Sequence, residues 1–140
     1  MIKLVITGHG EFANGMIDVI TLMMGDVIDL EKVVLDYSDL DEYSGRLEKL
    51  IQSSQEGTLI FTDVIGGTPF KTSALLCRKY DNVSVLTGVN VAMVLEAIIK
   101  RESAVSLKEL TDYTAEMGRT SIQAFDKQVL EERSRGYQNP

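Results

Sequence analysis

Residues 3–10 read KLVITGHG, a short apolar run that passes into a histidine flanked by two glycines. The run from Lys3 to Thr7 is nearly continuous in apolar residues, which is typical of a strand buried on both faces of a parallel sheet. Apolar residues then recur at helical spacing, at Ile17, Ile20, Met23 and Met24. A buried strand, a glycine-rich turn and an amphipathic helix together predict a βα unit.

The same unit recurs three more times along the chain. Strands are predicted over residues 32–36, 58–62 and 83–86, each followed by a helical pattern. For the third helix, Thr68 is a suitable N-cap and Pro69 a suitable first residue. The fourth helix is expected over residues 91–100, and a capping box at Ser106–Glu109 opens a fifth.

Consecutive βα units predict an α/β fold with right-handed crossovers and helices on both faces of the sheet. We expect an open, flavodoxin-like, doubly wound sheet with four parallel strands in the order 2-1-3-4. Residues 121–125 are a candidate for an additional antiparallel edge strand at the C-terminal end. The sequence therefore predicts a domain over residues 1–125, followed by a polar C-terminal tail over residues 126–140.

The amino-acid composition argues against a nucleic-acid-binding protein and against a structural zinc site. The 140 residues include one histidine, and the formal net charge is −7 at pH 7, which argues against a nucleic-acid partner. A structural zinc site needs several Cys and His ligands, so no metal is expected. Cys77 is the single cysteine, which agrees with a reducing compartment. Neither a leader nor a membrane-spanning segment is expected, and the expected location is the cytoplasm.

The predicted topology brings His9 and Asp63 together. Ligands of doubly wound sheets bind at the carboxyl ends of the strands where the strand order reverses. His9 follows the first strand and Asp63 follows the third, so the two side chains are expected within hydrogen-bond reach. A carboxylate on one imidazole nitrogen fixes the tautomer and leaves the other nitrogen free as a nucleophile. Taken alone, a histidine such as His9 is more often a solvated loop residue. An aspartate such as Asp63, taken alone, is more often a helix cap or a turn residue.

The tripeptide Gly66-Gly67-Thr68 is a candidate anion site beside that pair. A glycine-rich turn that runs into a helix start directs free N–H groups and the positive end of the helix dipole at one spot. Thr68 adds a hydroxyl group. On its own this segment indicates no more than a helix cap, but together with His9 and Asp63 it predicts the handling of a phosphoryl group.

Three segments also resemble a known family: ITGHG at 6–10 with Ala13 and Gly15, DVIGGTPF at 63–70, and TGVN at 87–90. In order and spacing they are similar, from about residue 2 to residue 125, to the mannose/fructose/sorbose family of phosphotransferase-system (PTS) IIA domains. The resemblance implies that His9 is phosphorylated, that Asp63 holds its ring, and that Thr68 and nearby backbone amides bind the phosphoryl group. Two departures are Lys71, where asparagine is common, and Val91-Ala92-Met93, where a proline is usual.

The resemblance implies a phosphocarrier that needs no cofactor. His9 would take a phosphoryl group from phospho-HPr and pass it to a separate IIB component, and indirectly to the membrane IIC and IID components and a sugar. The family also forms dimers in which a C-terminal strand crosses to the partner, which suggests a homodimer here. Two alternatives stay open: a phosphocarrier subunit of a dihydroxyacetone kinase, and a flavodoxin-like sensor that binds an anion without a covalent bond.

Overall fold

Four parallel strands form the central sheet, in the order β2-β1-β3-β4. The computed structural model describes residues 1–138 of the chain. The strands are β1 (Lys3–Gly8), β2 (Leu30–Val34), β3 (Thr58–Thr62) and β4 (Val83–Leu86). The predicted flavodoxin-like fold and its strand order are thereby confirmed.

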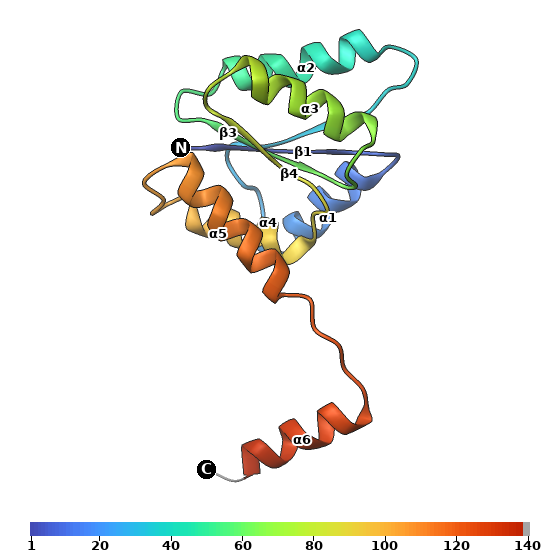
Figure 1. Cartoon of the computed structure of the whole chain (residues 1–140), viewed down its shortest axis with the longest axis vertical. Coiled ribbons are helices and arrows are strands. Elements are labelled where there is room, and N and C mark those ends of the chain that lie inside the picture. The colour runs from blue at the N-terminus through green and yellow to red at the C-terminus, as the bar shows by residue number, and fades with distance from the viewer. Residues whose placement is uncertain (139–140) are drawn as a thin grey trace.

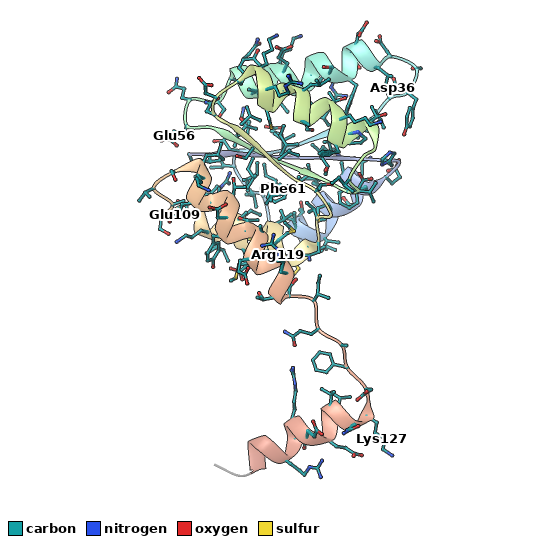
Figure 2. The ribbon with its side chains drawn as sticks, viewed as in Figure 1. Asp36, Glu56, Phe61, Glu109, Arg119 and Lys127 are labelled. Atoms are coloured by element: carbon teal, nitrogen blue, oxygen red, sulfur yellow. The ribbon has the colours of Figure 1, made fainter. Side chains whose placement is uncertain are left out.

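Helices cover both faces of this sheet, as Figure 1 shows. One face packs against α1 (Phe12–Met24), α4 (Val91–Lys100) and α5 (Leu107–Thr120). The other face packs against α2 (Leu40–Gln52) and α3 (Thr68–Lys79). The strands alternate between the two cores: Phe61, labelled in Figure 2, belongs to the first and Ile60 to the second. Across residues 1–138, no helix has both the length and the apolar character that crossing a bilayer requires.

The strand register determines where the loops after the strands meet. β1 pairs with β2 up to Gly8↔Val34, and with β3 up to Thr7↔Thr62. Parallel pairing therefore places the residues that follow β1, β2 and β3 at one edge of the sheet. His9 follows β1, and Asp63 follows β3.

β2 spans residues 30–34, not the predicted 32–36. Its pairing with β1 ends at Val34, and Leu35 is buried beyond that ladder rather than within it. The carboxylate of Asp36 accepts hydrogen bonds from the backbone N–H and the hydroxyl of Ser38, at 2.9 and 2.6 Å, which closes a turn. The apolar pattern is therefore a guide to burial here, but not to pairing.

The predicted N-cap of α3 is also wrong by one residue. Gly67 is the N-cap, with an extended backbone and no capping side chain, and Thr68 is the first residue inside the helix. Side chains do cap the next two helices: Asn90 accepts the N–H of Met93, and Ser106 accepts the N–H of Glu109, each at 3.0 Å.

The C-terminal segment differs most from the expectation. Ser121 closes α5, because its N–H donates to the Met117 carbonyl at 3.1 Å, and residues 122–126 continue without strand pairing to any described residue. The predicted edge strand over residues 121–125 is therefore absent from the described single chain. Within the predicted tail, Lys127–Gln138 form helix α6, which lies apart from the sheet and its helices (Figure 1), and residues 139–140 lie outside the described range.

Candidate functional site

His9 lies at the turn between β1 and α1. Its carbonyl accepts the N–H of Phe12 at 3.1 Å, and Gly10 next to it has a φ of +53°, a conformation that favours glycine. The His9 side chain is 37% exposed. The imidazole is thus fixed at its root and accessible at its tip.

Asp63 holds the imidazole from the neighbouring strand. Its Oδ2 lies 2.8 Å from His9 Nδ1 and 2.7 Å from the His9 backbone nitrogen, while Oδ1 accepts the Val64 N–H at 2.8 Å. The two side chains therefore meet within hydrogen-bond distance, as the topology predicts. Because both the ring and the backbone of His9 bond to one carboxylate, the ring has little freedom to turn.

The protonation state of this pair follows from the bonds to Asp63. Burial by itself raises the pKa of Asp63, but hydrogen bonds from the backbone and ring of His9 and from the Val64 N–H outweigh it, and the pKa lies below its ordinary value. An ionised carboxylate can only accept hydrogen bonds, so Nδ1 of His9 must carry the proton. The lone pair of Nε2 is then free to act as a nucleophile.

The loop after β4 holds the backbone of Asp63. The Gly88 N–H donates to the Asp63 carbonyl at 3.1 Å, and the Val89 N–H donates to the Thr62 carbonyl at 3.3 Å. Gly88 has a φ of +71°, which is strained for other residues. The TGVN segment at 87–90 therefore holds the backbone that carries the Asp63 carboxylate.

Gly67 brings the start of α3 against the ring. A Cβ atom added at Gly67 would lie 2.5 Å from Cε1 and 2.9 Å from Nε2 of His9, too close for any side chain. Gly66 before it has a φ of +88°. The helix start can approach the nucleophilic edge of the imidazole because both residues are glycines.

The neighbouring Thr68 is not bonded to the pair. Among the hydrogen bonds of residues 1–138, none involves the Thr68 hydroxyl, which leaves it available to a ligand. The backbone N–H groups of Thr68 and Phe70 lie in the first turn of α3, where a helix has no internal acceptor for them. Gly67 thus contacts His9, while Gly66 and Thr68 flank that contact.

Three residues near the site are not among those predicted from the sequence: Tyr37, Thr7 and Tyr43. Tyr37, in the turn after β2, has its ring centroid 6.4 Å from that of His9. Below the site, Thr7 donates to the Val33 carbonyl at 2.7 Å and so must accept the Tyr43 hydroxyl, 2.6 Å away. The predicted strand order could have indicated Tyr37, since the second strand neighbours the first.

The arrangement offers a nucleophile, an orienting carboxylate and an anion-binding helix start. In the part of the chain that the structure describes, no group of three or more His, Cys, Asp and Glu side chains is placed to hold a metal ion. An imidazole oriented by a carboxylate beside the free N–H groups of a helix start can act as a nucleophile toward an anionic group.

The chain is similar to known components of sugar phosphotransferase systems (PTS). Residues 3–114 match the family model described as PTS system fructose IIA component. The chain is 28% identical to the fructose-specific EIIA component of Bacillus subtilis, covering 92% of this chain and 90% of that protein. It is 26% identical to the mannose-specific EIIAB component of Escherichia coli, but spans 41% of that protein's length. EIIA from Streptococcus agalactiae superposes with a TM-score of 0.83 at 26% identity, over 89% of this chain and 98% of that one.

Proposed function

Because the chain belongs to the family of PTS fructose IIA components, we propose that it is a phosphocarrier of a sugar phosphotransferase system that holds the phosphoryl group on His9. The observation that carries this proposal is the 2.8 Å contact between His9 Nδ1 and Asp63 Oδ2, which leaves Nε2 free. In the proposed cycle the group comes from phospho-HPr and passes to a IIB component, then to a sugar that enters through membrane IIC and IID components.

Transfer begins with in-line attack of Nε2 on the phosphorus of phospho-HPr. A bond forms between Nε2 and phosphorus as the bond to the donor nitrogen breaks, and that electron pair returns to the donor. The product ring carries the phosphoryl group on Nε2 and a proton on Nδ1, so it is cationic. The ionised Asp63 stabilises this cation at 2.8 Å, and transfer to IIB reverses the same steps.

The phosphoryl oxygens are proposed to bind at the start of α3. The free N–H groups of the first turn of α3 and the positive end of the helix dipole attract anions. The Thr68 hydroxyl adds a further donor. Gly66 and Gly67 permit the close approach that such binding needs. These donors neutralise charge that develops in the transition state, so the proposal includes no metal or nucleotide cofactor. We place the exchange in the cytoplasm, in keeping with the single cysteine.

The proposal is tested by incubation with phosphoenolpyruvate, enzyme I and HPr, followed by intact mass measurement. A phosphocarrier gains one acid-labile phosphoryl group per chain, whereas an anion sensor gains none. A second incubation then offers the labelled protein either a IIB component or a dihydroxyacetone kinase. Loss of label to IIB supports the sugar system, and loss only to the kinase supports the alternative carrier.

Gly67→Ala is expected to slow phosphorylation of His9 without unfolding the protein. The new methyl group would lie 2.5 Å from His9 Cε1, so the ring must move away from its position at the helix start. A misplaced reacting group is expected to cost ~100-fold in transfer rate, measured in a single turnover with phospho-HPr. Gly45→Ala is the control, because a Cβ there meets nothing within 4 Å. Equal rates in both variants would contradict a role for the close approach.

We also infer that the protein is a homodimer whose C-terminal segment contacts the second copy. The segment after α5 exposes Ile122 (77%) and Phe125 (50%), and β4 is an edge strand of the sheet. Exposed strand edges and apolar segments favour pairing with another chain. The full chain is therefore expected to have the mass of a dimer in light scattering at micromolar concentration.

Two truncations identify the part of the segment that matters. Deleting residues 122–140 is expected to give a monomer, whereas deleting residues 127–140 removes α6 but keeps the extended segment and the dimer. A full-length chain that is monomeric at micromolar concentration would contradict the dimer without affecting the case for His9.

A further inference from the structure

Tyr37 contributes an aromatic side chain to the edge of the sheet where His9 lies. Its ring centroid is 6.4 Å from that of the imidazole, and the two planes are inclined by 35°. This separation is within the range in which aromatic rings interact. Tyr37 is 63% exposed, so its ring is not held there by burial in the core.

The turn that carries Tyr37 is held on both sides. Before it, the Asp36 carboxylate accepts two hydrogen bonds from Ser38; after it, Asp39 caps α2 by accepting the Glu42 N–H at 3.0 Å. Figure 2 labels Asp36 on the side of the molecule where β1 ends. The backbone therefore presents Tyr37 to the site from a defined position, although its side chain faces solvent.

Tyr37 comes to the site from the β2 side of β1, whereas Asp63 comes from the β3 side. In the sheet, β1 lies between β2 and β3, and Tyr37 follows β2 while Asp63 follows β3. Asp63 bonds to Nδ1, and Gly67 lies along the edge from Cε1 to Nε2. A ring on the β2 side would limit displacement of the imidazole away from these contacts.

We propose that Tyr37 is a positioning residue whose aromatic ring, 6.4 Å from the imidazole, limits the movement of the His9 ring and stabilises it when phosphorylated; this rests on the proposed phosphocarrier function. The phosphorylated imidazole is cationic, and aromatic faces attract cations. The effect needs the aromatic ring and not the hydroxyl group. Hydrolysis breaks the bond between Nε2 and phosphorus as a water oxygen bonds to phosphorus, yielding inorganic phosphate and neutral imidazole, and Tyr37 opposes this loss by stabilising the cationic ring.

The test compares Tyr37→Ala, Tyr37→Phe and wild type after phosphorylation and removal of enzyme I and HPr. Intact mass then gives the half-life of the phosphohistidine at fixed pH, with no partner present. Tyr37→Ala is expected to shorten this half-life by roughly 2- to 10-fold, the fold-change that corresponds to one aromatic pair. Tyr37→Phe is expected to retain the wild-type half-life. Leu22→Ala, which removes an 88% exposed side chain from α1, serves as the control.

A second measurement separates positioning from docking. Tyr37→Ala should lower the single-turnover rate at saturating phospho-HPr, because the misplaced ring reacts slowly even in the complex. A variant that has the wild-type half-life and only a raised KM for phospho-HPr would show a docking residue and overturn the proposal. A phosphohistidine half-life that is shortened in Tyr37→Phe as well would also overturn the proposal, because phenylalanine keeps the aromatic ring. A wild-type chain that gains no phosphoryl group would instead refute the phosphocarrier function itself.

Discussion

His9→Ala is expected to fold like the wild type and to gain no phosphoryl group from phospho-HPr. The sequence contains no second histidine that could take its place as acceptor. The side chain is 37% exposed and lies at a turn rather than in either buried core, so its removal leaves the packing intact. The expected loss is complete, because the bond to phosphorus can no longer form.

Intact mass after incubation with phosphoenolpyruvate, enzyme I and HPr measures this result. Thermal unfolding followed by circular dichroism is the control, and the midpoint should stay close to that of the wild type. A folded His9→Ala protein that still gains an acid-labile phosphoryl group would show that the nucleophile has been misassigned.

Asp63→Asn is expected to keep the binding of HPr but to lower the rate of phosphoryl transfer by ~100-fold or more. The amide has nearly the same shape as the carboxylate, yet its NH₂ group would donate to Nδ1 and favour the tautomer with the proton on Nε2. An amide also cannot neutralise the cationic phosphohistidine. The first effect removes the nucleophilic lone pair from Nε2, and the second destabilises the cation that forms at the ring 2.8 Å away.

Single-turnover transfer from phospho-HPr measures the rate, and the binding of HPr is titrated separately. Asp81→Asn is the matched control, because Asp81 is an exposed carboxylate just before β4, at the other end of the sheet. Wild-type transfer in Asp63→Asn would contradict the proposed pairing with His9.

Asp63→Asn should also change how the free energy of unfolding depends on pH. The folded-state pKa of Asp63 lies below its ordinary value, because its hydrogen bonds to His9 and Val64 outweigh the effect of burial. Such a group stabilises the fold fully above its unfolded pKa and loses that contribution as the pH falls through the folded value. The free energy of unfolding in urea should therefore fall less steeply with acid in Asp63→Asn than in wild type.

Most of the fold could be predicted from local sequence. The predicted strands at 58–62 and 83–86 and the predicted helix at 91–100 coincide with β3, β4 and α4. Apolar periodicity and capping residues extend over a few positions, so the residues that predict a helix or strand lie within that same segment. The meeting of His9 and Asp63 could also be predicted, because the residues that follow adjacent parallel strands share one edge of the sheet.

Tertiary structure alone decided the features that depend on contacts between distant segments. The α/β class, the strand order and the His9–Asp63 pair could be inferred from the sequence, since these follow from periodicity and topology. The end of β2 depends on where its ladder with β1 stops, and a lone segment at 121–125 can form no strand without a neighbour. The approach of Gly67 to the imidazole and the position of Tyr37 depend on packing between separate loops. Distances between such loops cannot be predicted from the spacing of residues in the sequence.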